Sequence, residues 1–433
     1  MAMDGKELVE KLAKLSQVQS IKDIPQLTHA LFPGTHCPLM GAAMAVGGIK
    51  DSLIVVVGTD ECTYYTKSMT IHSEKFGGID GRCVSVVLDD HDVTFGSAEK
   101  VQGAFKEIIE EYRPQCVFLV TTCVIEIIGD DFDAISEGLS ELYGIPVLPV
   151  HTEHFKCEDH LPGLERTITV CAEMMKSCDC DNSVNLLGQR MGDFATTELY
   201  AMLQKAGVKI GLQLPCGCSV DDIKNAAAAK VNIVVNDIAL PLAQKMQEKF
   251  GIPYVYFNKF VIPEKIYEAY KNLFGYLELE LPGELEGLYQ NAREKIEKNK
   301  GELEGITYIY GNTPYAVFEM NCFLSSLGMV PQVIQTNRYT EADEPYAKEI
   351  LQYTDPYVCK AANIAPLQYV YDVLSPYLYL GHEFGNRLRQ KGIAIVRSDR
   401  ASGMLGFEVT GYLLQQLVKS VREAKEYRKE LCL

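Results

Sequence analysis

The feature that most constrains the fold is a repeated alternation of short apolar runs with longer amphipathic segments. Leu53–Val57, Val117–Val120 and Val147–Val150 have the composition of buried strands, and they are separated by helical patterns such as Ser97–Tyr112 and Phe132–Tyr143. Strands that alternate with helices in this way are typical of parallel sheets covered by helices. The chain is therefore predicted to be α/β, and its 433 residues are too many for one ordinary core.

The alternation recurs in three parts of the chain, which predicts three α/β units. The first unit is expected over residues 1–180 and the second over 181–304, beginning with the apolar run Val184–Gly188. The third unit is expected over residues 305–433. The N-terminal stretch Met1–Gln19 has the pattern of a charged amphipathic helix and not that of a signal peptide.

Composition narrows the class of protein. Fourteen cysteines without a secretion signal favour reduced thiols and metal sites over disulfides. A net charge of −17 argues against a nucleic-acid partner, and no apolar run is long enough to span a membrane. Neither a Walker A motif nor GxGxxG is present, so the chain itself is not expected to bind ATP or a dinucleotide. A cytoplasmic protein without membrane or nucleic-acid partners is predicted.

Three cysteines lie where a strand or loop gives way to a helix. Cys62 follows the strand Leu53–Val57, Cys123 follows the strand 116–120, and Cys37 precedes a helical run. Ligands of open α/β sheets bind at the carboxyl ends of strands, and a helix N-terminus there favours an anionic ligand. A thiolate-ligated iron–sulfur cluster is such a ligand.

Buried cysteines can also serve only as small hydrophobic residues. This interpretation is preferred for the cysteines that fall within strands, within helices or in the C-terminal third of the chain. They are Cys83, Cys116, Cys171, Cys322, Cys359 and Cys432.

At the first three cysteines the chain resembles the nitrogenase component 1 family, most closely its β-type subunits. The matching stretches are Cys37–Ala42, Gly58–Cys62, Asp92–Gly96 and Thr121–Asp131. The step of 25 residues between the first two cysteines and the order of the stretches also fit. The resemblance is most specific in the first unit and looser beyond it.

The resemblance implies three Rossmann-like domains and an iron–sulfur cluster at a subunit interface. Cys37, Cys62 and Cys123 would carry half of an [8Fe–7S] P-cluster or hold a [4Fe–4S] cluster. The expected partners are a homologous α-type subunit, or a second copy of the chain, and an ATP-dependent iron protein of the nitrogenase type. The implied function is that of an oxidoreductase subunit that receives electrons through the cluster and passes them to a reduction site.

A second set of candidate ligands lies in His151–His160, directly after a predicted strand. In β-type subunits of nitrogenase the similar stretch carries a Ser close to the P-cluster, and here His154 occupies that position. An imidazole there would tune the cluster potential or relay a proton. The alternative is an exposed polar loop. His151, Cys157 and His160 are weaker candidates.

The ligands of the active cofactor of nitrogenase have no counterpart here. The middle-domain cysteine of the catalytic subunit follows a strand like Val231–Val235, where this chain continues with Asn236–Ile238. Its C-terminal histidine lies in a turn that this chain lacks, and His382 is the one histidine in the last third. Cys216 and Cys218 form a Cys-x-Cys loop after another strand, which is either a cofactor or substrate site or a structural loop.

Two other functions remain open at this point. The chain could be a scaffold on which a metallocluster of the iron–molybdenum-cofactor type is assembled and then handed on, because scaffolds share the fold and often the cysteines. It could also be a cluster-free structural homologue. The missing cofactor ligands argue against dinitrogen reduction by this subunit alone.

Overall fold

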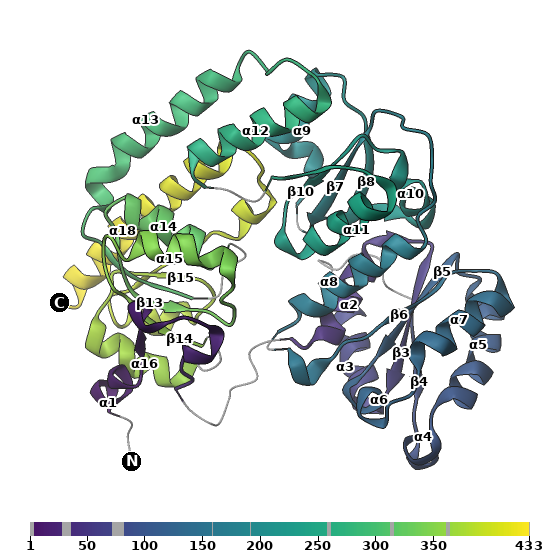
Figure 1. The fold of residues 1–433 in the computed structure, drawn as a ribbon. Coiled ribbons are helices and arrows are strands. Elements are labelled where there is room, and N and C mark those ends of the chain that lie inside the picture. The colour runs from purple at the N-terminus through teal and green to yellow at the C-terminus, as the bar shows by residue number, and fades with distance from the viewer. Residues whose placement is uncertain are drawn as a thin grey trace.

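Three β-sheets, each covered by helices and parallel except for one edge strand, form the framework of the molecule (Figure 1). The computed structural model describes residues 4–27, 36–71, 82–157, 159–190, 192–257, 261–311, 316–360 and 364–432. The α/β prediction is therefore confirmed. Within the described residues, no helix combines the length and apolar character needed to cross a bilayer.

The N-terminal unit contains a four-stranded parallel sheet in the order β4-β3-β5-β6. The strands are β3 (Ser52–Gly58), β4 (Cys83–Val87), β5 (Cys116–Thr121) and β6 (Val147–Val150). The helices are α2 (Pro38–Gly47), α3 (Asp60–Ile71), α4 (Asp90–Phe95), α5 (Ala98–Tyr112), α6 (Cys123–Ile128), α7 (Phe132–Tyr143) and α8 (Leu161–Val170). Strands β3 and β5 are buried along their whole length because helices cover both faces, which explains their uninterrupted apolar sequence.

The middle unit contains a second parallel sheet, in the order β11-β10-β7-β8. Its strands are β7 (Val184–Gln189), β8 (Ile210–Pro215), β10 (Val231–Val234) and β11 (Tyr254–Tyr256). Its helices are α9 (Glu198–Lys205), α10 (Val220–Lys224), α11 (Leu240–Phe250) and α12 (Pro263–Leu277). A short parallel pair, β2 (Ile49–Lys50) with β9 (Cys218–Ser219), joins this unit to the N-terminal one.

The C-terminal unit is built on a six-stranded sheet in the order β1-β14-β13-β12-β15-β16. Its strands are β1 (Ala13–Lys14), β12 (Thr307–Tyr310), β13 (Val330–Gln335), β14 (Tyr357–Cys359), β15 (Leu378–Leu380) and β16 (Ala394–Val396). Its helices are α1 (Gly5–Glu10), α13 (Leu285–Leu303), α14 (Val317–Ser326), α15 (Glu344–Ile350), α16 (Ile364–Leu374), α17 (Gly385–Arg389) and α18 (Glu408–Glu430).

The N-terminal segment differs from its sequence-based prediction in two respects. Helix α1 covers only Gly5–Glu10, because the chain then becomes strand β1 and pairs antiparallel with β14. Residues 4–27 also belong with the C-terminal sheet, not with the first unit in which the predicted boundary 1–180 placed them. Leu8 and Leu12 are buried against the helix-α16 face of that sheet, where burial of their apolar surface fixes the segment.

Helices α2 and α8 cross with their backbones in contact. A Cβ on Gly41 would lie 1.9 Å from the carbonyl oxygen of His160, and one on Gly163 would lie 1.8 Å from that of Pro38. Only glycine permits so close an approach. The crossing brings the start of α2, where Cys37 is the N-cap, beside the start of α8.

Candidate metal centre and inter-domain site

The three predicted cluster ligands converge on one edge of the N-terminal sheet. Strands β3 and β5 are parallel neighbours, with Val57 paired to Thr121, so their carboxyl ends meet at that edge. Cys62 lies in the first turn of α3, after β3, and Cys123 is the first residue of α6, after β5. Cys37 approaches from α2, which packs against α3 and both strands.

The thiols of these cysteines are half-buried and close enough to influence one another. Burial raises the pKa of Cys123, and the neighbouring Cys62 and Cys37 raise it further. The backbone N–H of Val124, at the start of α6, acts in the opposite direction. Thiolates that repel one another in a partly dry site are stabilised when cations are bound between them.

The three cysteine sulfurs do not form a compact ligand set for one metal ion. In the described part of the chain, ligand atoms that all lie within 4.8 Å of one another occur in one group of three, Asp89, His91 and Asp92. At least one pair of the sulfurs of Cys37, Cys62 and Cys123 is therefore more than 4.8 Å apart.

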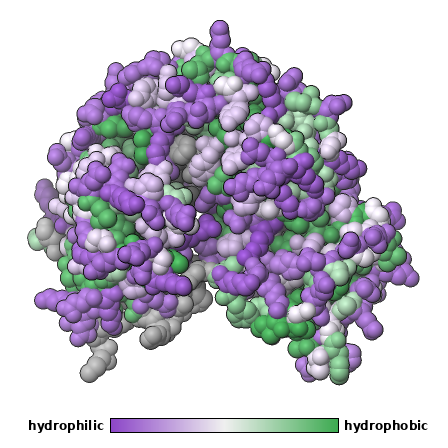
Figure 2. Space-filling view, in the orientation of Figure 1, coloured by the Kyte–Doolittle hydropathy of each residue, from purple (hydrophilic) through white to green (hydrophobic). Residues whose placement is uncertain are grey.

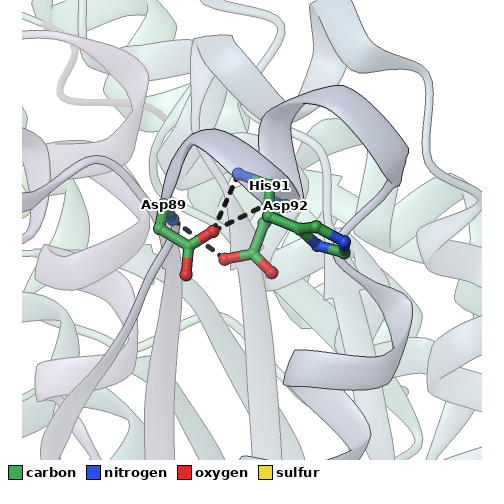
Figure 3. Close-up of side chains that lie close together, drawn as sticks. All are labelled: Asp89, His91 and Asp92. Carbon is green, nitrogen blue, oxygen red and sulfur yellow. Dashed lines mark hydrogen bonds between the residues drawn. The ribbon is translucent and has the colours of Figure 1, made fainter.

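The Asp89, His91 and Asp92 group has a structural explanation. Asp89 Oδ1 accepts hydrogen bonds from the backbone N–H groups of His91 and Asp92 at 2.9 and 3.1 Å, and Asp92 Oδ2 accepts from the Asp89 N–H at 2.9 Å (Figure 3). This capping box begins helix α4. The Lys100 ammonium lies 2.5 Å from Asp92 and 3.0 Å from Asp89, and it lowers the pKa of Asp89 to about 2. The positive charge beside these two carboxylates is therefore supplied by Lys100, and the group does not need a metal ion.

The histidine-rich stretch is divided between two environments. His154 lies in an exposed 3-10 turn, and its ring is 5.9 Å from that of Phe155, so its role beside a cluster stays a prediction. His151 Nε2 is 3.1 Å from a carboxylate oxygen of Asp133. His160 points inward, where its ring centroid lies 6.3 Å from that of His36, and burial and the positive charge of Arg190 lower its pKa to about 4.

A cavity of about 320 Å³ opens beside Cys123, at the carboxyl ends of β5 and β6. Its wall is organised by Glu126, whose Oε1 accepts hydrogen bonds from the Thr121 hydroxyl and the Glu153 N–H, both at 2.7 Å. Ile127 and Phe155 line its mouth and are 70% and 71% exposed. In the sequence, the part of this wall within Thr121–Asp131 is noted only as a stretch that resembles the family, and no cavity is predicted there.

Large apolar side chains are unusually exposed around this edge. Besides the two at the cavity mouth, Phe95 at the end of α4 is 76% exposed and Tyr64 on α3 is 71% exposed. Helices α4 and α6 lie side by side, and Figure 2 shows hydrophobic residues gathered over that end of the N-terminal unit. Exposed apolar patches of this kind mark interaction surfaces.

A second polar cluster lies where the three units meet. It is formed by residues that follow strand carboxyl ends or begin helix α8, and it joins groups far apart in the sequence. They are His160 of the N-terminal unit, Arg190, Cys216 and Asp237 of the middle unit, and Arg338 of the C-terminal unit. Arg338 and Asp237 form an ion pair at 3.6 Å across the boundary between their units. Sequence reasoning missed both arginines because neither belongs to a motif.

The two thiols of the Cys-x-Cys loop lie in different places. Cys216 is half-buried at the junction, and its thiol donates a hydrogen bond to the carbonyl oxygen of Arg190 at 3.3 Å. Cys218 is 1% exposed within the core, and burial raises its pKa to about 12. Gly217 between them has φ +86°, in the left-handed region that favours glycine.

The junction does not fit the metal cofactor that the resemblance implies for a catalytic subunit. After β10 the chain continues with Asn236–Ile238, which contains no cysteine, and Asp237 there forms an ion pair with Arg338. His382 has a side chain that is 71% exposed and lies 3.5 Å from Asp399 at the surface. A thiolate and an imidazole are thus absent from the two ligand positions within the described residues.

Comparison with known proteins identifies the family. Residues 37–422 match the nitrogenase component 1 type oxidoreductases. The chain is 31% identical over 224 residues to the nitrogenase iron–molybdenum cofactor biosynthesis protein NifE of Clostridium pasteurianum, which covers 51% of this chain and 49% of that protein. It is 25% identical over 331 residues to NifE of Rippkaea orientalis (73% of this chain, 69% of that protein). It is 24% identical over 330 residues to the nitrogenase molybdenum–iron protein alpha chain of Methanosarcina barkeri (72% and 62%).

The fold is also that of a solved nitrogenase chain. The structure named nitrogenase Cp1 at pH 6.5 superposes with a TM-score of 0.78 at 15% identity, covering 93% of this chain and 95% of that one. The chain spans about half the length of the Clostridium relative, so that protein's activity does not transfer with the match. The extent of the family match and the shared fold together establish the membership: this chain belongs to the nitrogenase component 1 type oxidoreductase family.

Proposed function

We propose that this chain is one subunit of a scaffold on which a metallocluster is assembled, and that it holds a resident iron–sulfur cluster through Cys37, Cys62 and Cys123. The observation that carries the proposal is the convergence of these three half-buried thiols on one sheet edge. A cluster bound there, of the [4Fe–4S] or [8Fe–7S] type, supplies one-electron redox chemistry.

The assembly role rests on two further observations. Three of the similar curated proteins, from Clostridium, Rippkaea and Methanococcus, are named cofactor biosynthesis proteins. The inter-domain junction carries an ion pair, Asp237 with Arg338, at the place where a catalytic subunit ligates its cofactor. A subunit that assembles a metallocluster and releases it does not need those permanent ligands.

A second subunit is part of the proposal. Three thiolates at an open edge leave a shared cluster incomplete, so a homologous subunit or a second copy supplies the remainder. The exposed side chains of Phe95, Ile127 and Phe155 give that edge an apolar surface for docking.

The competing function is that of a reductase subunit fed by an ATP-dependent iron protein. One observation favours it: the apolar surface over α4 and α6 lies at the same end of the unit as the cysteines, as electron delivery over a short distance requires. Similarity to a molybdenum–iron protein alpha chain is compatible with it.

The test is anaerobic purification with native partners, followed by metal analysis and visible spectroscopy. Cys37→Ala, Cys62→Ala and Cys123→Ala are expected to lose most of the iron, whereas the matched control Cys322→Ala keeps it because its thiol is buried in the C-terminal core. Full iron content in all three variants would refute the cluster, and an iron-free wild type would leave only a structural homologue.

Radiolabelled iron separates the two roles. Transfer of labelled iron in excess of the resident cluster to an acceptor protein supports the scaffold. Retention of all label during turnover with an iron protein and ATP supports the reductase instead.

A further inference from the structure

We infer that the junction of the three units binds a small oxyanion, carboxylate or phosphate, through Arg190 and Arg338. The inference does not depend on the proposed resident cluster, because it concerns a site that contains none of the three cluster cysteines. The family resemblance implies a metal cofactor at this place, but the residues present do not fit one. We infer that an oxyanion binds there instead.

Arg190 is the central observation. It follows strand β7 and is half-buried, yet within the described part of the chain its guanidinium makes no hydrogen bond or ion pair. Burial lowers its pKa, and the nearest opposing charges are Asp237, Cys216 and Asp159. An oxyanion that enters the junction would supply hydrogen bonds that the described residues do not give this guanidinium.

Arg82 shows what a purely structural arginine looks like in this chain. It is also half-buried, but its guanidinium donates to the carbonyl oxygens of Ile49 at 2.6 Å and Gly47 at 3.3 Å. Its donors thereby hold the N-terminal unit together. Arg190 is also half-buried and makes none of these bonds with the described residues.

Arg338 faces the same junction from the C-terminal unit. Its side chain is 40% exposed, and its guanidinium reaches Asp237 at 3.6 Å, longer than a close hydrogen-bonded ion pair. Asp237 therefore holds Arg338 weakly, and an incoming oxyanion could compete for it.

The other charged groups at the junction have contacts of their own. Asp159 accepts a hydrogen bond from the Leu161 N–H at 2.9 Å, and Asp343 accepts two from Thr340. His160 is uncharged at neutral pH, and burial raises the pKa of Glu165. The unused hydrogen-bonding capacity is the planar fork of Arg190, which matches carboxylate and phosphate and whose bonds to an oxyanion must outweigh the nearby carboxylates.

The test measures oxyanion binding to the protein purified anaerobically with its metals, by titration calorimetry. Sodium phosphate and sodium succinate are the two probes, and sodium chloride at equal ionic strength is the control for general screening. Arg190→Gln is expected to weaken binding of the preferred probe at least about tenfold. Asp237→Asn is expected to tighten it, because Arg338 loses its competing partner.

Arg422→Gln is the matched control, since that arginine pairs with Glu302 on the surface of the C-terminal unit. Unchanged affinity in Arg190→Gln, weaker binding in Asp237→Asn, or equal loss in the control would each overturn the inference. So would wild-type protein that binds neither probe above the chloride background.

Metal analysis of the same variants separates this inference from the proposed function. Arg190→Gln should keep all its metal, and loss of metal from it would mean that the junction holds a metallocluster instead. Cys37→Ala should lose iron but still bind the oxyanion. Each claim can therefore fail without the other.

Discussion

The carbonyl oxygen of His160 lies against Gly41, only 1.9 Å from the point where a Cβ on that residue would be. This backbone contact between α8 and α2 fixes the position of Cys37 at the start of α2. The candidate cluster site and the inter-domain junction thus share one helix crossing.

Gly41→Ala should destabilise the protein and reduce its iron content. The added methyl group meets backbone, which cannot rotate away, so a cost of at least about 1–3 kcal/mol is expected. The control is Gly103→Ala on α5, where nothing lies within 4 Å, and which should gain up to about 1 kcal/mol of helix stability. Denaturant unfolding and iron assay would check both variants; equal stability of the two would contradict the contact.

Charges placed on the apolar edge should separate the subunits. In the double variant Ile127→Asp with Phe155→Asp, two side chains that are about 70% exposed become acidic and no longer favour a buried interface. Native mass spectrometry should then find the complex dissociated. Tyr353→Asp, on the C-terminal unit and 57% exposed, should leave the complex intact. Dissociation in both or neither would place the interface elsewhere.

His154→Ala should change the properties of the cluster and not its presence. An imidazole beside a cluster supplies a polar nitrogen and alters the hydrogen bonding around it, so removal of the ring should shift the potential of a nearby cluster. A redox titration followed by electron paramagnetic resonance, across pH 6 to 8, would compare the variant with wild type. Identical potentials and pH dependence would assign His154 to an exposed loop.

His160 makes the stability of the protein depend on pH. Burial and the charge of Arg190 lower its pKa from 6.5 to about 4, so between these values the unfolded chain binds the proton and the folded chain does not. Stability is fully present above pH 6.5 and falls as the pH drops toward 4, by up to about 3 kcal/mol in total.

His160→Gln should flatten this pH dependence. Urea unfolding at pH 7 and pH 5 would measure it, with His91→Gln, an exposed residue, as the control. A variant as acid-sensitive as wild type would show that other groups cause the loss.

What the sequence could predict was local. Runs such as Leu53–Val57 identify buried strands, and a cysteine just beyond such a run must lie at a strand end, so the positions of Cys62 and Cys123 followed from short stretches. Their shared role as cluster ligands is a prediction from the family resemblance. Arg190 and Arg338 could not be found in this way, because they are brought together by the packing of two separate sheets and neither carries a local pattern.

Two smaller differences have the same origin. The charged pattern of the N-terminal stretch is compatible with a long helix, and only its pairing with β14, a strand more than 300 residues away, ends that helix at Glu10. In the Cys-x-Cys loop, spacing alone could not reveal that Cys216 is half-buried whereas Cys218 lies in the core.

The pairing of β1 with β14 also means that the path of the chain through the three units returns to the sheet from which it came. The chain starts on the C-terminal sheet, continues into the N-terminal unit, passes through the middle unit and returns to the sheet where it began. The outer two units are thereby tethered from both sides, which restricts how far they could swing open. A shortened chain that began at Cys37 would lack β1. Strand β14 would then be an unpaired sheet edge, open to pairing with another molecule.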